Sequence, residues 1–344
     1  MKALVKTEKG RGCLELLDVP VPVPGPGEVL LKILAAGVCG TDLHVRDDQF
    51  PYWPPVTLGH EFCGRVEKLG PGVSLVALGD RVVGEPHTRA CGHCYLCRTG
   101  NIQICSAKRS PGWGIDGAMA EYLVMPERLL HKVPDSMSDE VAAVIEPAAN
   151  VVHDVLERAT VSAGDLVVVI GPGPIGLLAA MAARAAGARE VVITGRNVDE
   201  PLRLAKARQL GFTHSISSEQ RDPAEVVQEL SNGRGADLIV ECSGSAGGIA
   251  QGVQLARKKA RFCAIGLTGK DTIAFPYRDA SFKVLDMYFC LSTSYTCWDK
   301  AIHLAAAGKM DLASIITHRE PLANWASVFK AMDEQLALKA VLIP

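Results

Sequence analysis

The sequence predicts an α/β fold in two parts: a β-barrel-like domain and a domain built on a doubly wound parallel sheet. Three observations lead to this prediction. The length of 344 residues suits about two domains at roughly 150 residues each. The first part consists of short apolar runs separated by proline and glycine, and from near Asp165 apolar runs alternate with helical patterns.

The barrel-like part rests on short strands with turn residues between them. Proline and glycine punctuate these strands, as in the stretch Pro20-Val21-Pro22-Val23-Pro24-Gly25-Pro26-Gly27. Many short strands are expected here, for example Met1–Lys6, Glu28–Ala35, Gly64–Leu69 and Arg81–Gly84. Mixed structure returns near the end of the chain, where helices are expected at Trp298–Ala307 and Asn324–Glu334.

The second part shows strand–helix alternation, which implies a parallel sheet with helices on both faces. The expected strands are Leu166–Ile170, Val191–Thr194, Asp237–Glu241 and Ala260–Ile265. The expected helices between them are Pro174–Ala186, Leu202–Leu210 and Ala246–Ala256.

Composition excludes several classes of protein. The formal net charge is −2, which provides neither a nucleic-acid footprint nor a basic face for an anionic membrane. The uncharged stretch Leu166–Ala183 contains Gly171-Pro172-Gly173-Pro174, so a strand, a turn and a helix explain it better than a membrane span. Charges interrupt the first nine residues, so no signal peptide is expected. Eleven cysteines without an export signal favour a cytoplasmic protein without a disulfide framework.

The glycine turn after the first strand of the second part predicts dinucleotide binding. Leu166–Ile170 is followed directly by Gly171-Pro172-Gly173-Pro174-Ile175-Gly176 and then by a helical pattern. Such a turn brings its backbone close to a pyrophosphate, which then lies at the helix N-terminus. A glycine-rich turn without a ligand is the alternative.

The cofactor prediction favours NADP over NAD. An NAD site usually has an acidic residue about 20 residues after the glycine turn. Gly195 occupies that position here, and Arg196 next to it can pair with a 2′-phosphate. In the alternative, Arg196 is a solvated loop residue and Asp199 reaches the ribose of NAD.

Four cysteines predict a structural zinc site. Cys91, Cys94, Cys97 and Cys105 have the spacing C-x2-C-x2-C-x7-C, which can fold one loop around a tetrahedral zinc. His93 lies between ligands and is expected to be a bystander. An iron–sulfur cluster is the alternative, but its spacing differs and its last cysteine usually precedes proline, where Ser106 stands here.

A second group of residues predicts a catalytic metal. Cys39, His60, Glu61 and Glu146 together offer a thiolate, an imidazole and carboxylates. Each alone is weak, because single cysteine and histidine residues are usually structural. The set as a whole suits zinc with one open coordination position.

The order of these motifs resembles the zinc-containing medium-chain dehydrogenase/reductase superfamily, and within it the sorbitol (polyol) and threonine dehydrogenase branch. The resemblance implies a GroES-like catalytic domain at 1–151 and 290–344, with a zinc lobe at about 86–110, and a Rossmann domain at 152–289. It implies that Cys39, His60, Glu61 and Glu146 hold the catalytic zinc, with the carboxylates binding directly or through water. Glu146 replaces a third cysteine of other alcohol dehydrogenases, which indicates this branch.

The resemblance assigns further roles. Thr41 hands on the substrate proton, and His44 relays it toward solvent. Lys339 resembles a family lysine near the cofactor phosphates, with a solvated lysine as the alternative. Further cofactor-binding residues are expected at the ends of later strands and beyond, at Cys242, Ser243, Gly266, Leu267 and Leu291.

One segment departs from the family pattern. Sorbitol-type enzymes have an Arg-Tyr pair before the tryptophan that matches Trp298, and no arginine is present here. The substrate is therefore predicted only as a small secondary alcohol, either a polyol or an amino alcohol such as threonine.

The function predicted is hydride transfer between NAD(P) and that alcohol, by a homodimer or homotetramer that binds two zinc ions per chain. Two alternatives remain. One is a metal-free quinone or enone reductase that uses NADPH, and the other is a zinc-stapled sensor or scaffold without enzymatic activity.

Overall fold

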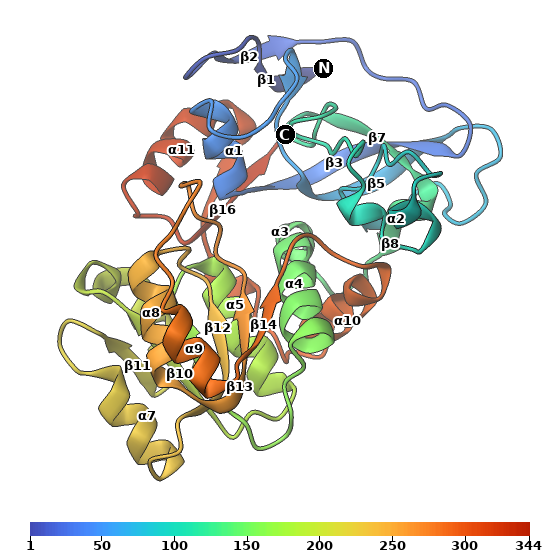
Figure 1. Ribbon diagram of the computed structural model, residues 1–344. Coiled ribbons are helices and arrows are strands. Elements are labelled where there is room, and N and C mark those ends of the chain that lie inside the picture. Colours follow the sequence, from blue (N-terminus) through green and yellow to red (C-terminus); the bar gives the residue numbers. More distant parts are fainter. The chain divides into compact units, whose positions relative to one another are not determined.

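The computed structural model describes residues 1–344 and separates into two compact units (Figure 1). The first unit comprises Met1–Pro147, Thr293–Ala306 and Ile316–Pro344. The second comprises Ala148–Ser292 and Ala307–Ile315.

The first unit contains two sheets. A seven-stranded sheet has the order β15-β16-β3-β5-β6-β8, with β7 pairing β3, and a three-stranded sheet has the order β2-β1-β4. The strands are β1 (Lys2–Lys6), β2 (Leu14–Asp18), β3 (Glu28–Val38), β4 (Val56–Thr57), β5 (Glu61–Leu69), β6 (Arg81–Gly84), β7 (Tyr122–Pro126), β8 (Leu130–Lys132), β15 (Ile316–Pro321) and β16 (Lys339–Ile343). Segments far apart in the sequence thus meet in one sheet, because Ala340 of β16 pairs with Val38 of β3.

Short helices connect these strands. They are α1 (Gly40–Arg46), α2 (Tyr95–Arg98), η1 (Ile102–Ile104), η2 (Glu127–Leu129), α3 (Asp139–Ala143), α10 (Tyr295–Ala306), η7 (Leu322–Asn324) and α11 (Trp325–Asp333). Alternating apolar side chains of the strands, such as Leu31 and Ile33 of β3, bury one face in a common core with Phe329 of α11. Each such fully buried side chain contributes about 1.5–3 kcal/mol to folding.

The second unit is a parallel six-stranded sheet with the order β11-β10-β9-β12-β13-β14. Its strands are β9 (Leu166–Ile170), β10 (Glu190–Gly195), β11 (His214–Ser217), β12 (Ala236–Glu241), β13 (Ala256–Ala264) and β14 (Asp286–Phe289). Its helices are α4 (Ile145–Val151, which begins in the first unit), η3 (Val152–Arg158), α5 (Pro174–Ala185), η4 (Asn197–Asp199), η5 (Glu200–Leu204), α6 (Ala205–Gln209), α7 (Pro223–Ser231), α8 (Ala246–Leu255), α9 (Tyr277–Lys283) and η6 (Ala313–Ile315). Every side chain of the central strand β9 is buried, which explains its continuous apolar run.

The predicted combination of a β domain and a domain built on a parallel sheet is confirmed. The sequence prediction missed the short strands β11 and β14 and the helix α7. It also began β5 three residues late, at Gly64 rather than Glu61, and β13 four residues late, at Ala260 rather than Ala256. Charged side chains in the early part of β13 interrupt its apolar run, so a prediction based on apolar runs placed the start of that strand too late.

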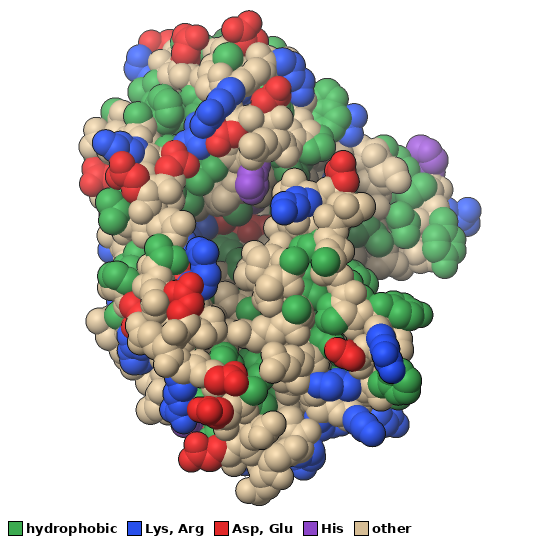
Figure 2. Space-filling model, turned by 60° about the vertical axis from the view of Figure 1, so that its left-hand side comes forward, with side chains coloured by type: hydrophobic (Ala, Val, Ile, Leu, Met, Phe, Trp, Pro, Cys, Tyr) green, Lys and Arg blue, Asp and Glu red, His purple; other side chains and the backbone are tan.

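Acidic and basic side chains are interspersed on the surface shown in Figure 2. No helix combines the length and the apolar character that crossing a bilayer requires.

Candidate metal centres and dinucleotide site

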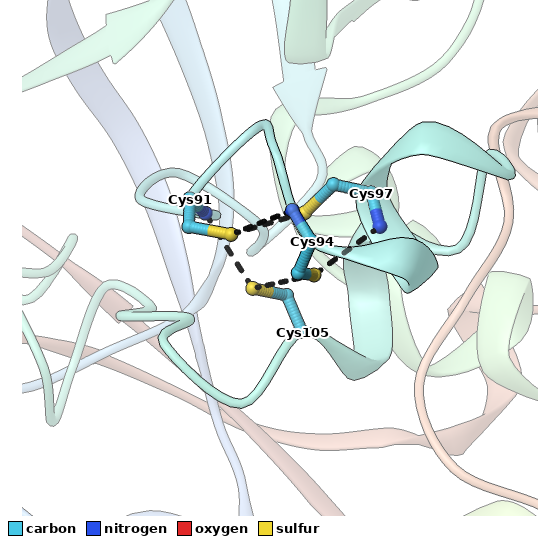
Figure 3. Close-up of side chains that lie close together, drawn as sticks. All are labelled: Cys91, Cys94, Cys97 and Cys105. Atoms are coloured by element: carbon cyan, nitrogen blue, oxygen red, sulfur yellow. Dashed lines mark hydrogen bonds between the residues drawn. The ribbon is translucent and has the colours of Figure 1, made fainter.

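The four predicted cysteines lie together, with their sulfur atoms pointing at one another (Figure 3). Cys91 Sγ lies 3.9 Å from Cys97 Sγ, and Cys94 Sγ lies 3.9 Å from Cys105 Sγ. Four sulfurs placed about 2.3 Å from a central zinc in a tetrahedron are roughly 3.8 Å apart. The set therefore has the dimensions of a closed tetrahedral zinc site.

Backbone amides hold three of these sulfurs and favour the thiolate form of Cys91 and Cys105, whereas burial raises the pKa of Cys97 to about 12. The N–H groups of Cys91, Cys94 and Cys97 point at the sulfurs of Cys105, Cys91 and Cys94, at 3.4–3.5 Å. Donation by backbone N–H groups lowers the pKa of Cys105 to about 6. Zinc binds thiolates, so this loop fits the metal both electrostatically and geometrically. The His93 ring is exposed, with its Nδ1 atom 2.8 Å from the carbonyl oxygen of Cys91.

The second cluster is assembled from segments that adjoin the sheet of the first unit. Cys39 follows β3 as the N-cap of α1, where its N–H donates to Asp42 Oδ2 at 2.8 Å. His60 precedes β5 and follows Gly59, which has φ +95° and no room for a side chain against Met119. The ligand atoms of Cys39, His60 and Glu61 lie within 4.8 Å of one another.

The Glu61 carboxylate is held by a lysine from the last strand. Both of its oxygens lie close to Lys339 Nζ, at 2.6 Å and 2.5 Å, and Lys339 also donates to Val38 O. Glu61 and Lys339 are 0% and 3% exposed. Burial disfavours the charged lysine, but the carboxylate outweighs it and raises the pKa of Lys339.

The alternative of a solvated Lys339 was therefore wrong, because its ammonium is buried and pairs with Glu61. Gly37 makes this pairing possible, because any side chain there would occupy the space of the Glu61 carboxylate.

Negative charge surrounds His60. Burial opposes a charged imidazole, but the Cys39 sulfur, Asp42 and Glu146 raise the pKa of His60 to about 10. His60 Nδ1 is buried without a hydrogen-bond partner, because Asp42 Oδ1 lies 3.8 Å away. A buried, mostly anionic donor set with an unpartnered imidazole nitrogen fits a divalent cation.

Glu146 lies near this cluster but outside the set of three. It is buried in the first turn of α4, and its charge raises the pKa of both His60 and Lys339. Its charge also acts on Lys108, whose pKa burial nevertheless lowers.

The predicted proton-relay residues share one helix. Thr41 Oγ1 lies 3.7 Å from Cys39 Sγ, and His44 is exposed one turn further along α1. On the other side of His60, the Trp113 ring makes an edge contact at 5.0 Å between ring centroids. Trp113 also contacts Phe50, with 5.4 Å between ring centroids, so an aromatic wall adjoins His60.

The glycine turn of the second unit has the geometry expected for a phosphate cradle. Gly171 has φ +96°, and a side chain at Gly176 would collide with the Gly171 carbonyl. A side chain at Gly173 would project into open space beside the N-terminus of α5, where Pro174 and Ile175 begin the helix. The turn therefore leaves open space beside the N-terminus of α5, where a pyrophosphate is expected.

A cavity of about 290 Å³ adjoins this turn. Gly195, Arg196, Asp199, Ser218 and Ser243 are among its lining residues. Asp199 accepts hydrogen bonds from Arg196 N and Arg203 Nη1, each at 2.9 Å, so both of its carboxylate oxygens are engaged. The Arg196 side chain is exposed and makes no hydrogen bond or ion pair.

The remaining predicted cofactor residues lie at the carboxyl ends of the later strands. Cys242 and Ser243 follow β12, and Gly266 packs so tightly against Gly244 that no side chain fits there. Leu267 and Leu291 are exposed beyond β13 and β14.

Sequence reasoning did not single out Asp42, Lys108 or the partner of Glu61. Two features of the sequence could have indicated the first and the last of these. Asp42 lies in the first turn of α1, and Lys339 begins the otherwise apolar strand β16. Lys108 carried no signal in the sequence.

A parallel sheet with a glycine turn, together with thiolate, imidazole and carboxylate groups, defines a zinc-dependent nicotinamide dehydrogenase. Residues 25–135 match the alcohol dehydrogenase GroES-like domain family, and residues 174–307 match the zinc-binding dehydrogenase family. The chain belongs to the zinc-containing medium-chain dehydrogenase/reductase superfamily, in its polyol and threonine dehydrogenase branch.

Proteins similar to this chain match it along its whole length. A sorbitol dehydrogenase of Halalkalibacterium halodurans is 37% identical over 344 residues, covering 100% of this chain and 99% of that protein. An L-threonine 3-dehydrogenase of Bacillus velezensis is 38% identical over 349 residues, with the same coverage. A zinc-binding dehydrogenase of Sinorhizobium meliloti, solved bound to NADP, has a TM-score of 0.92 at 30% identity and covers 100% of this chain and 99% of its own.

The chain is thus a zinc-dependent oxidoreductase that transfers hydride between a nicotinamide cofactor and an alcohol, as predicted. A non-enzymatic sensor and a metal-free reductase find no support among these relatives.

Proposed function

We propose that this enzyme oxidises a secondary alcohol whose neighbouring carbon carries a hydroxyl or an amino group. The observation that carries this proposal is the cluster of Cys39, His60 and Glu61, with Thr41 beside the Cys39 sulfur. Sorbitol and threonine, named for two relatives, share that arrangement of substituents. A polyol, a sugar alcohol and a threonine-like amino alcohol are therefore the candidate substrates.

Cys39 and His60 would hold the catalytic zinc, with Glu61 and Glu146 as the carboxylates that bind directly or through water. When bound, zinc supplies Lewis-acid polarisation of the substrate hydroxyl. Thr41 would accept the hydroxyl proton, and His44 would pass it to solvent from the exposed face of α1. Trp113 would limit the bulk of the substrate beside His60.

The charge at Lys108 guides the choice of substrates to test. The side-chain ammonium of Lys108 makes no hydrogen bond or ion pair, and its charge interacts with that of Glu146. A substrate carrying a carboxylate or phosphate would pair with this ammonium, so anionic alcohols should be tested together with neutral ones.

The cofactor proposed is NADP rather than NAD. Asp199 is the residue that could bind a ribose hydroxyl in place of Gly195, but Arg196 N and Arg203 already occupy its oxygens. The exposed guanidinium of Arg196 beside the cavity can pair with a 2′-phosphate. Arg196→Ala should weaken NADP on the order of tenfold, a change of about 1.4 kcal/mol, and leave NAD unaffected.

The proposal includes two zinc ions per chain, one in the four-cysteine loop and one at Cys39. Metal analysis of dialysed protein should give two equivalents, and the Cys39→Ser variant should give one. A single equivalent in the wild-type chain would contradict the catalytic zinc.

The deciding experiment measures turnover of a panel of vicinal diols, amino alcohols and simple alcohols, each with NAD and with NADP. We expect reduction of NADP with a vicinal substrate, abolished by Cys39→Ser. Failure with every alcohol, in protein that binds both zinc and dinucleotide, would contradict the proposed substrate class.

A homodimer or homotetramer is part of the proposal. β14 is an edge strand of the six-stranded sheet, and Phe282, Val284 and Phe289 nearby are 71%, 61% and 73% exposed. An open edge flanked by apolar side chains favours pairing with a second copy across a two-fold axis. Light scattering should show that Phe289→Lys reduces the oligomer, whereas Leu78→Lys, also at an exposed position, does not.

A cytoplasmic location is proposed because all eleven cysteines are free thiols and zinc thiolates persist in a reducing compartment. Recovery of the native protein from an exported fraction would contradict it.

A further inference from the structure

Three cysteines outside the metal-binding clusters meet at the carboxyl ends of neighbouring strands in the second unit. Cys242 follows β12, Cys263 lies in β13 and Cys290 follows β14. Cys263 is paired in register with Tyr288, so Cys290, two residues further on, projects from the same face of the sheet. The Sγ atoms of Cys263 and Cys290 lie 3.7 Å apart.

The surroundings of the two sulfurs differ. Cys263 is completely buried, and its Sγ lies 3.5 Å from the carbonyl oxygen of Asp154 in η3. Cys290 is partly exposed and lies 3.8 Å from the carbonyl oxygen of Tyr288. Arg158, one helical turn after Asp154, donates to the neighbouring Phe289 O at 3.0 Å and brings a positive charge to Cys290.

These contacts make one sulfur nucleophilic and keep the other protonated. The Cys263 thiol donates a hydrogen bond that lowers the pKa of Cys290 to about 7. The positive charge of Arg158 acts in the same direction, whereas burial acts against it. The same hydrogen bond, together with burial, raises the pKa of Cys263. The other charged or titratable groups acting on this pair are Asp154 and the buried Cys242, whose own pKa burial raises.

We propose that Cys263 and Cys290 form a redox site that closes to a disulfide when the protein meets hydrogen peroxide. The partly exposed Cys290 thiolate attacks a peroxide oxygen, the O–O bond breaks, and a sulfenic acid and hydroxide result. The Cys263 sulfur then attacks the sulfenic sulfur, the S–S bond forms, and the second hydroxide leaves. Both sulfurs are oxidised, the peroxide is reduced, and the two thiol protons convert the hydroxides to two molecules of water.

This inference does not depend on the proposed substrate or cofactor, because its test reads covalent structure rather than activity. It does require that Cys290, one residue beyond the β14 edge proposed to pair with a second copy, stays accessible to peroxide in the oligomer. Zinc-loaded, full-length protein is treated with a small excess of peroxide, the remaining thiols are alkylated, and the peptides are mapped by mass spectrometry. We expect a Cys263–Cys290 linkage as the first disulfide formed, fully reversed by dithiothreitol.

Two serine variants sharpen the test. Cys242→Ser should form the same linkage at an unchanged rate, because Cys242 is a neighbour but not the partner. Cys263→Ser should stop at the sulfenic acid of Cys290, which dimedone traps. A dimedone adduct of wild-type Cys290 without any disulfide, or a linkage to Cys242 instead, would overturn the proposal.

The dependence of the rate on pH gives a separate criterion. With a pKa of about 7 for Cys290, the rate should rise roughly tenfold from pH 6 to pH 8 and only by about a tenth from pH 8 to pH 9. An ordinary cysteine, with a pKa of about 8.5, would still accelerate roughly threefold over the second interval. That continued rise would overturn the assignment of Cys290 as the attacking thiolate.

Discussion

The two ligand clusters of the first unit are built in opposite ways. The four-cysteine loop takes all its ligands from residues 91–105, and backbone amides of the same loop hold the sulfurs. The cluster of Cys39, His60 and Glu61 draws on separate segments, and its carboxylate is balanced by a lysine 278 residues away. The four-cysteine loop can form from the spacing of its own residues, whereas the cluster of Cys39, His60 and Glu61 depends on the complete sheet.

The largest expected difference between the clusters is in activity. Cys39→Ser should lower kcat/KM on the order of 1,000-fold, about 4 kcal/mol of transition-state stabilisation, while the thermal unfolding midpoint changes little. Cys94→Ser should instead release the zinc of the loop and lower the midpoint, because that metal contributes to folding. Metal analysis, activity assays and melting curves of both variants check this prediction. If both variants lost activity equally at unchanged stability, the two clusters would not differ in the way proposed.

The next effect concerns the charge balance at Glu61. Lys339→Met leaves a buried carboxylate without a partner and should reduce the free energy of unfolding by about 3–5 kcal/mol. The double variant Glu61→Gln with Lys339→Met removes both charges and should recover part of this loss. Urea unfolding measures both. A loss below about 1 kcal/mol for Lys339→Met would mean that the pair contributes little.

A smaller effect is expected from a residue that lies beside the second cluster without binding metal. Thr41→Val removes the hydroxyl and keeps the shape, so turnover should fall on the order of 100-fold through the lost proton transfer. Thr41→Ser should restore most of the activity, and the zinc content should stay the same in both variants. Loss of zinc in Thr41→Val would indicate a role in holding Cys39 instead.

The smallest effect belongs to the four-cysteine loop. His93 is exposed and lies outside the group of four sulfurs, so His93→Ala should change the free energy of unfolding by less than about 0.5 kcal/mol. Its zinc content should equal that of the wild type. Loss of one zinc would identify His93 as a ligand and change the description of the loop.

The same contrast explains what could be predicted from the sequence. The cysteine spacing and the turn from Gly171 to Gly176 are local patterns, and the structure arranges both as expected. The apolar run of β9 likewise indicated a central buried strand. Local spacing constrains local geometry, so these features required no knowledge of the rest of the chain.

The partner of Glu61 could not be predicted in this way. Lys339 looks like an edge or surface lysine until β16 pairs with β3 and carries it to Val38 and Glu61. β11 and β14 were missed because His214–Ser217 is polar and Asp286–Phe289 is short. Their strand conformation depends on neighbours in the sheet rather than on their own composition.

The pairing of Glu61 with Lys339 also has a consequence for the order of events during translation. The ribosome makes the carboxylate 278 residues before the ammonium that neutralises it. Because β16 completes the sheet beside β3, Lys339 reaches Glu61 only after the last strand has been added. The pocket therefore reaches its final charge balance only at the end of synthesis, and a metal ion can meet that balance only in the finished chain.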